Sequence, residues 1–233
     1  MSIETSFLAM RLEGPMQSWG LDSQYNRRRT GLMPTKSAIA GICAAACGIS
    51  RGSSEEAPFL EAFQVTKMTV IAIPRKQFKE RFLPVRRLED YHTVQNTRRA
   101  SGAINSDCVL THRQYLTDAA FGVIIEGASE YLAEVAEALH DPVWGTYLGR
   151  KSCIPSAPVY AGLCETKSAA LQLLIGDAPL TAFARQEDVE DFSKGKDSLP
   201  DLPVSFASEN RQFSPRRVCI HQIGDADSVT YDR

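Results

Sequence analysis

The chain has 233 residues, of which 43% are hydrophobic and 23% charged, and its formal net charge at pH 7 is -2. This composition is typical of a globular protein with one or two cores and excludes a chain that is disordered overall. No apolar run approaches the roughly 20 residues that span a bilayer, and the N-terminus lacks a signal-peptide pattern, so we expect a cytoplasmic protein without a membrane segment. The six cysteines are scattered and are expected to be reduced. Their spacing predicts no metal site, and no cofactor motif is present.

Charge is distributed unevenly along the chain. Residues 1–120 contain sixteen basic and eleven acidic residues, whereas residues 121–233 contain ten and seventeen. Between Arg75 and Arg99 there are eight basic and three acidic residues, so this stretch alone has the surplus of five that the whole first half has. Other side chains that suit nucleic acid are mixed into it, namely Phe78, Phe82, Tyr91, His92 and Asn96. The mixture predicts a nucleic-acid grip, and the alternative is a solvated, charged hairpin without a ligand.

The first quarter of the chain predicts a strand, a loop and a helix. Residues 6–12 alternate between apolar and polar side chains, as in a half-buried strand that ends at Gly14-Pro15. Residues 16–34 have no periodicity and predict a long ordered loop. The helix that follows, Lys36 to Gly48, has small apolar side chains on one face, and Thr35 or Ser37 is its expected cap.

Four further elements complete an α+β pattern. The sequence predicts strands over Val65–Ile73, Ala119–Glu126 and Pro158–Cys164, and a helix over Ser129–His140. A strand-like segment at residues 109–116 follows the basic stretch, so residues 75–112 are expected to be an inserted basic β-hairpin arm. Without the loops, the order is strand, helix, strand, strand, helix, strand. This is the β-α-β-β-α-β order of a ferredoxin-like domain, the architecture of RNA-recognition modules, here expected to cover residues 1–165.

Residues 166–233 are predicted to form a small C-terminal extension. Ser168–Ile175 suits a short helix, and Thr181–Arg185 and Arg217–Ile223 suit strands. Residues 187–201 contain six acidic residues together with a glycine and a proline, and we expect an acidic loop there.

Two groups of candidate RNA-binding residues lie outside the arm. Trp19 and Tyr25 lie in the loop after the first strand, close to the run Arg27, Arg28, Arg29. They are candidates to stack on a base while the arginines bind the RNA backbone. The alternative for Trp19 is burial in the core. Lys36 and Ser37 open a helix whose free amides favour a phosphate; capping of the helix by Thr35 or Ser37 is the safer interpretation, and both roles can coexist. The glycine-containing basic segment 149–152 lacks the complete phosphate-binding signature, and a plain surface turn is its alternative.

Five phrases of this sequence occur together in a known family. They are Arg11–Gly20 (RLEGPMQSWG), Pro34–Ser37 (PTKS), Asp90–Val94 (DYHTV), Arg113–Asp118 (RQYLTD) and Tyr147–Cys153 (YLGRKSC). In this order they resemble the CasD family, the small RAMP-type subunits of the type I-E CRISPR surveillance complex Cascade. The resemblance implies a ferredoxin-like RAMP domain with a thumb-like hairpin that binds the 5′ handle of CRISPR RNA.

The resemblance also implies partners. CasD subunits cap one end of the filament of CasC backbone subunits, the large subunit CasA docks nearby, and the assembled complex targets DNA for antiviral defence. Cleavage of the RNA belongs to another subunit, CasE, so the resemblance implies a protein that is not an enzyme. The resulting RNA-binding candidates are Trp19, Tyr25, Arg27, Arg28, Arg29, Lys36, Ser37, Arg86, Arg87, His92, Asn96, Arg98, Arg99, Tyr147, Gly149, Arg150, Lys151 and Ser152.

A metal-independent repeat endoribonuclease is the alternative function, because a relative in type I-C processes its own RNA. Cleavage at a ribose needs a base for the 2′-hydroxyl proton and an acid for the leaving oxygen. Tyr91 and His92 are the weak catalytic candidates, with His112 and Lys151 as groups that could approach them. Neighbours in an extended segment point to opposite faces, however, and this disfavours a shared site for Tyr91 and His92.

Overall fold

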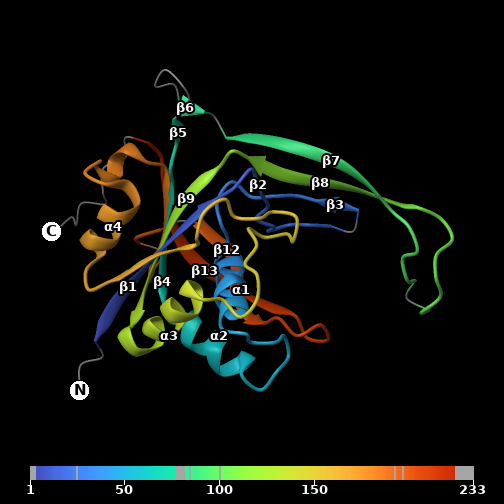
Figure 1. Cartoon of the computed structure of the whole chain (residues 1–233), viewed down its shortest axis with the longest axis horizontal. Helices are drawn as coiled ribbons and strands as arrows, with labels where there is room; N and C mark the ends of the chain where they lie inside the picture. The colour runs from blue at the N-terminus through green and yellow to red at the C-terminus, as the bar shows by residue number, and fades with distance from the viewer. Residues whose placement is uncertain are drawn as a thin grey trace.

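A seven-stranded antiparallel sheet forms the centre of the protein (Figure 1). The computed structural model of the chain describes residues 4–24, 26–76, 82–83, 85–99, 101–191, 193–195 and 197–223. In spatial order the strands of the sheet are β10 (Tyr160–Cys164), β1 (Thr5–Glu13), β9 (Ala120–Ala128), β4 (Lys67–Ala72), β11 (Arg185–Asp188), β13 (Gln212–His221) and β12 (Asp197–Ser205). Strands from both ends of the chain therefore hydrogen bond within one sheet.

Alternation along β1 separates the two faces of this sheet. Leu8, Met10 and Leu12 are fully buried in the larger core, as the period-two pattern predicts, whereas Ala9 between them belongs to a second cluster with Ile124. Helices α1 (Lys36–Ala46), α2 (Glu56–Gln64) and α3 (Ser129–His140) contribute to the larger core. Helix α4 (Lys167–Ile175) contributes to the second cluster, so it covers the opposite face.

Helix α1 begins where the sequence predicts. The side chain of Thr35 is the N-cap and accepts a hydrogen bond from the backbone N–H of Ala38 at 3.2 Å. Seven of the eleven residues of the helix are buried, most of them small, and this lets the helix pack closely on its neighbours. The sequence interpretation contained no helix at Glu56–Gln64, where Phe59, Leu60 and Phe63 bury one side of α2.

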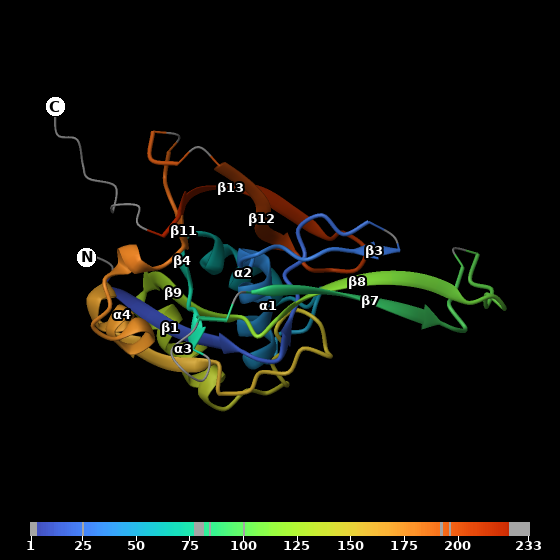
Figure 2. The same ribbon diagram turned by 90° about the horizontal axis from the view of Figure 1, so that it is seen from above.

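The predicted hairpin is the most extended feature of the molecule. Strands β7 (Arg86–Val94) and β8 (Val109–Thr117) pair antiparallel along their full length, and Figures 1 and 2 show the hairpin projecting away from the central sheet. Strand β8 also pairs with two short strands, at its root with β2 (Met16–Gln17) and near its middle with β3 (Arg27–Arg28). The segment 16–34 therefore contributes two short strands to the sheet of the arm. A separate two-stranded pair, β5 (Arg75–Lys76) with β6 (Phe82–Leu83), precedes β7.

The prediction of an acidic loop over all of residues 187–201 is wrong at both ends of this segment. Strand β11 ends at Asp188 and β12 begins at Asp197, and the carboxylates of Asp188 and Asp201 contact cations instead of solvent. Asp201 is buried and pairs with Arg216, which also contacts Asp188. The predicted strand at 181–185 is displaced, since residues 180–182 form a 3-10 turn and β11 begins at Arg185. The division at residue 165 stays a prediction.

No helix in the described part of the chain is long and apolar enough to cross a membrane.

Candidate nucleic-acid interface

The β7–β8 arm presents its charged side chains to solvent. Arg86, Arg87, Arg98 and Arg99 are all exposed, as is Asn96 in the left-handed region at φ 55°. Arg99 donates to the side-chain oxygen of Asn105 at 2.8 Å, an exposed contact that leaves its charge uncompensated. Within the described ranges, none of these four arginines forms an ion pair with a carboxylate. The arm therefore offers a row of unneutralised cations, which is what attraction of a phosphate backbone needs.

One face of the arm brings together an aromatic ring and an imidazole. Tyr91 lies directly opposite His112 in the β7–β8 register, and their rings meet edge to face with centroids 5.4 Å apart. The Nδ1 atom of His112 is 3.3 Å from Oε1 of Glu89 on the same face. Strand β3 continues this face, because Arg27 pairs with His112 in the parallel ladder. The hydrogen bond from Gln114 and the nearby imidazole lower the pKa of Glu89.

His92 lies on the other face of the arm. Its Nε2 atom contacts the carboxylate of Asp90, two residues earlier on β7. Tyr91 and His92 thus point to opposite sides, so the structure does not bring together the two weak catalytic candidates. The pair that the structure does bring together is Tyr91 with His112.

The segment 147–153 is joined to the root of the arm through Arg150. Its guanidinium stacks over the ring of Tyr115, with the carbon 4.6 Å from the ring centroid. Nη1 donates to the carbonyl of Gln114 at 3.1 Å, and Nη2 donates to the carbonyl of Arg28 at 2.8 Å. Arg150 therefore links β8 to β3 and fixes the segment against the arm, while Lys151 and Ser152 beside it remain exposed.

Gly149 is required by close packing against the segment after β2. Its φ is +96°, and a Cβ atom at this position would lie 1.8 Å from the carbonyl oxygen of Ser18. The backbone N–H of Ser18 also donates to the carbonyl of Leu148 at 3.0 Å. The glycine is therefore explained by backbone contact within the protein, whether or not RNA approaches it.

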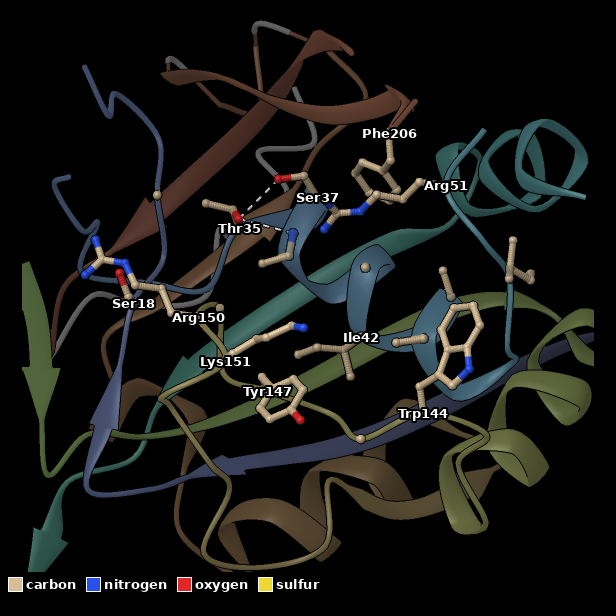
Figure 3. A pocket seen from close by; sticks show the side chains of 18 of the residues that line it. Ser18, Thr35, Ser37, Ile42, Arg51, Trp144, Tyr147, Arg150, Lys151 and Phe206 are labelled. Atoms are coloured by element: carbon tan, nitrogen blue, oxygen red, sulfur yellow. Dashed lines mark hydrogen bonds between the residues drawn. The ribbon is translucent and has the colours of Figure 1, made fainter. Parts of the chain in front are cut away.

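A groove of about 620 Å³ runs from the root of the arm across α1 (Figure 3). Its floor is the small-residue face of α1, with Ser37, Gly41 and Ile42 among the lining residues. Figure 3 shows Arg150 and Ser18 at one end, Lys151 and Tyr147 along one wall, and Arg51 with Phe206 at the other end. Several predicted binding residues from distant parts of the chain line one surface here: Ser37, Tyr147, Gly149, Arg150 and Lys151.

Trp19 does not reach this groove with its ring. The side chain is 0% exposed within the larger core, and its Nε1 atom donates to the side-chain oxygen of Gln17 at 3.2 Å. The backbone of Trp19 is also satisfied, since its N–H donates to Thr30 Oγ1 at 2.8 Å. The prediction that Trp19 stacks on a base is wrong in this structure, because its apolar ring and its polar atom both have partners in the interior.

Lys36 is also an interior residue. It is 2% exposed, and its Nζ atom donates to the carbonyl of Thr66 at 2.5 Å and to Asp188 Oδ2 at 2.9 Å. Its backbone N–H donates to Asp201 Oδ2 at 2.8 Å, so a carboxylate of the protein takes the place expected for a phosphate at the start of α1. The predicted phosphate contact of Lys36 is therefore wrong. Burial lowers the pKa of Lys36, and the charge of Asp188 opposes that effect.

The remaining predicted residues are placed as follows. Arg27, Arg28 and Arg29 are exposed beside the arm, with Arg29 paired to Asp22 at 3.2 Å. Ser37 lines the groove, and its hydroxyl lies 3.3 Å from that of Thr35. Tyr25 and Phe78 lie outside the described residues. A role in RNA binding stays a prediction for all of the exposed candidates.

The groove residues that were not predicted include two arginines and a tryptophan: Arg51, Arg211 and Trp144. Trp144 is 44% exposed, and its backbone N–H donates to the carbonyl of Ala45 at 3.2 Å, which holds the segment after Pro142 against the end of α1. The three residues are far apart in the sequence, and none lies in a cluster of basic residues. The position of Trp144 shortly after the helix-ending Asp141-Pro142 was a weak sequence signal, and its exposure became known only from the structure.

The comparisons with known proteins agree on one family. The family model described as CRISPR-associated protein (Cas_Cas5) matches residues 7–219. The chain is 32% identical over 211 residues to the CRISPR system Cascade subunit CasD of Escherichia coli (strain K12), which covers 87% of this chain and 93% of that protein.

Solved structures give the same relationship. A chain of a CRISPR RNA-guided surveillance complex superimposes with a TM-score of 0.69 at 27% identity, covering 92% of this chain and 88% of that one. A crystal structure of a Cas protein superimposes with a TM-score of 0.66 at 29% identity, covering 93% and 94%. The chain belongs to the Cas5 family of CRISPR-associated proteins.

Proposed function

We propose that this chain is the RNA-binding subunit of a Cascade-type surveillance complex and that its arm grips the 5′ handle of CRISPR RNA. The observation that carries the proposal is the β7–β8 hairpin, whose exposed arginines have no carboxylate partner in the described part of the chain. The similarity to CasD of the Cascade system supports the same function. Arg150 and Lys151 at the root of the arm extend the basic surface into the groove along α1.

The architecture supports a RAMP-type, ferredoxin-like domain. Strands β10, β1, β9 and β4 are neighbours and antiparallel, and α1 and α3 lie on one face of them. Numbered by their order among these four, the strands follow the spatial sequence 4-1-3-2. We assign β1, α1, β4, β9, α3 and β10 to the β-α-β-β-α-β unit, with the arm inserted between β4 and β9.

The partners follow from membership of such a complex. A subunit at the handle end would cap the filament of CasC subunits, adjoin the large subunit CasA and reach target DNA only through the assembled complex. The setting is the cytoplasm, where CRISPR RNA is made. The exposed apolar side chains on the arm, Leu88, Leu110 and Ile104, offer contacts for a neighbouring subunit.

The proposal is for a binding protein that does not cleave its RNA. Of the catalytic candidates, the structure brings together Tyr91 and His112, and the Glu89 carboxylate lies 3.3 Å from Nδ1 of the His112 imidazole. A stacking or hydrogen-bonding contact with RNA suits Tyr91 and His112 as well as proton transfer does. The repeat endoribonuclease remains the alternative function.

The test is binding of a fluorescent handle RNA to the purified chain at several salt concentrations. Replacing Arg98 and Arg99 by alanine should weaken binding about equally for all RNA sequences. It should also lower the salt slope, the magnitude of the slope of log affinity against log salt concentration, by about 1.4, because each phosphate contact on a single strand contributes about 0.7. The matched control replaces Lys167 and Lys194, two basic residues away from the arm that pair with Glu187 and Glu190. Unchanged affinity and slope in the arm variant, with the wild type binding RNA, would contradict the proposal.

A further inference from the structure

Two arginines from distant segments close the end of the α1 groove that is remote from the arm. Arg51 follows α1 and Arg211 precedes β13, and both line the groove. Neither forms an ion pair within the part of the chain that the structure describes. The guanidinium of Arg211 lies over the ring of Phe213, 5.3 Å from its centroid, which holds the charge in place without neutralising it.

The acidic residue that lines the groove, Glu56, hydrogen bonds to backbone amides. Glu56 is buried, and its two oxygens accept the backbone N–H of Gly52 at 2.9 Å and that of Phe206 at 3.0 Å. These two amides belong to the segments that carry Arg51 and Arg211. Glu56 therefore holds the two segments together, and the hydrogen bonds that its two oxygens accept come from these backbone amides.

Two cations held close together without a counter-ion repel each other. The pKa of Arg211 is lowered, first because its guanidinium is partly covered although the residue is exposed, and then by the positive charge of Arg51. An anion between the two guanidinium groups would remove this repulsion and would form charge-assisted hydrogen bonds to both. A phosphate group fits this description, because guanidinium groups bind its oxygens in a fork geometry.

The rest of the groove suits nucleotides. Trp144 and Tyr147 line one wall and are 44% and 38% exposed, so their rings are accessible to a base. Gly41 and Ala45 on α1 leave room opposite them, and the volume of about 620 Å³ lies within the range of about 300 to 1,000 Å³ that organic ligands occupy. The groove begins at Arg150 and Lys151, where the arm joins the body.

We infer that Arg51 and Arg211 form a second phosphate-binding site, so that an RNA strand held by the arm continues across α1 and ends between these two arginines. The inference rests on the proposed function and extends it by naming where the strand leaves the arm. Trp144 stacks on a base of this continuing segment. An acidic segment of a protein would satisfy the arginines as well, but it would leave the exposed Trp144 and Tyr147 rings without a role.

The experiment combines a charge-removing variant with shortened RNAs. Arg51→Ala/Arg211→Ala is compared with the wild type on the handle RNA and on RNAs shortened one nucleotide at a time from each end. The double variant should bind the full handle about tenfold more weakly and with a salt slope lower by about 1.4. Removing the nucleotides that reach the arginines should weaken the wild type and have little further effect on the variant. Both arginines are exposed, and thermal unfolding of the variant checks that it folds.

A second measurement reports the stacking contact directly. The chain has two tryptophans, of which Trp19 is buried and Trp144 exposed. Full handle RNA should quench the fluorescence of Trp144, the quenching should disappear in Trp144→Phe, and RNA shortened at the relevant end should quench less.

The outcomes separate this inference from the proposed function. If shortening the RNA weakens the wild type and the Arg51/Arg211 variant by the same factor at both ends, the second site does not exist, although the arm still binds. If the variant binds every RNA normally and instead loses a co-purifying protein subunit, the arginines dock a protein and the inference is wrong. If the wild-type chain binds no RNA, the proposed function fails and this inference fails with it. The Lys167→Ala/Lys194→Ala control removes the same charge elsewhere and should behave as the wild type.

Discussion

Arg216 and Asp201 form a two-bond ion pair in the interior of the protein, with Nε 2.7 Å from Oδ1 and Nη2 3.0 Å from Oδ2. The same Asp201 accepts the backbone N–H of Lys36 at 2.8 Å, and Arg216 also contacts Asp188, which accepts Nζ of Lys36 at 2.9 Å. These four residues, the buried ion cluster, connect β11, β12 and β13 to the start of α1. The C-terminal strands are thereby joined to the helix that forms the floor of the groove.

Replacing Asp201 by alanine should lower the free energy of unfolding by about 3 to 5 kcal/mol, because it leaves the Arg216 guanidinium buried without its main partner. Urea unfolding followed by circular dichroism measures the loss. Asp197→Ala is the control, since Asp197 is on the same strand but exposed. A loss below about 1 kcal/mol in Asp201→Ala would show that the cluster does not stabilise the fold.

Lys36→Met should leave the salt dependence of RNA binding unchanged. The ammonium group of Lys36 is surrounded by Thr66 and Asp188 and has no access to a phosphate. Measurement of the handle-RNA affinity between 50 and about 200 mM salt covers the range in which phosphate contacts are readily detected. A slope lower by about 0.7 in a normally folded variant would restore Lys36 as an RNA ligand.

Gly149→Ala should destabilise the protein by about 3 kcal/mol, since the new methyl group collides with the backbone of Ser18 and the φ of +96° disfavours a side chain. Gly102→Ala is a matched control. Gly102 has a φ of +82°, but no atom lies within 4 Å of the position that the new methyl group would take, so only the backbone cost of about 1 kcal/mol applies. Equal losses in the two variants, measured by thermal unfolding, would contradict the packing explanation.

Repeat RNA incubated with the purified chain in the absence of metal should remain intact. Tyr91 is exposed and lies next to the half-buried His112, yet an acid and a base also need a ribose positioned between them. Gel analysis of labelled RNA makes the test, with Tyr91→Phe and His112→Ala as the informative variants. Specific cutting by the wild type that both variants lose would establish the endoribonuclease alternative, and His92→Ala is the control on the opposite face.

Thiol labelling of the native protein should begin at Cys108, the exposed cysteine on the arm, and should not reach Cys43. Burial, with a smaller contribution from Cys47, raises the pKa of Cys43, so its reactive thiolate is suppressed. The same pKa shift determines how the free energy of unfolding depends on pH. Cys43 ionises more easily in the unfolded chain than in the folded protein. Its contribution to stability is therefore complete below the ordinary thiol pKa of about 8.5 and decreases as the pH rises above that value. Cys43→Ala should show a smaller loss of stability between pH 8 and about 10 than the wild type.

The pattern of apolar and polar residues within a short segment was sufficient to predict strands and helices of the core that have one apolar face. The alternation over residues 6–12 predicted β1, and the Thr35 cap with a stripe of small residues predicted α1, because both signals depend on residues a few positions apart. The arm was predicted from charge that is concentrated within one short stretch. Helix α2 was missed because residues 50–57, which lead into it, are rich in serine, glycine and glutamate, a composition typical of a loop.

Charged and aromatic side chains were harder to place, because their positions depend on partners far away in the sequence. Lys36 was taken for a phosphate ligand, yet its partner Asp188 is 152 positions away. The acids of residues 187–201 were interpreted as a solvated loop, yet Arg216 neutralises two of them across the sheet. Burying a charge costs several kcal/mol unless a partner is present, and folding supplies that partner through strand pairing that no local pattern encodes.

The family, the arm and the basic character of its surface could thus be inferred from the order of the residues alone, since these features belong to short continuous segments. The groove across α1 could not, because Arg51, Trp144 and Arg211 become neighbours only when α1, the segment after α3 and the start of β13 pack together. Burial also separated the two tryptophans: packing enclosed Trp19 in the core and left Trp144 accessible at the groove. The free energy of burying apolar surface depends on how the whole chain packs. Which of the two tryptophans is buried can therefore be known only from the tertiary structure.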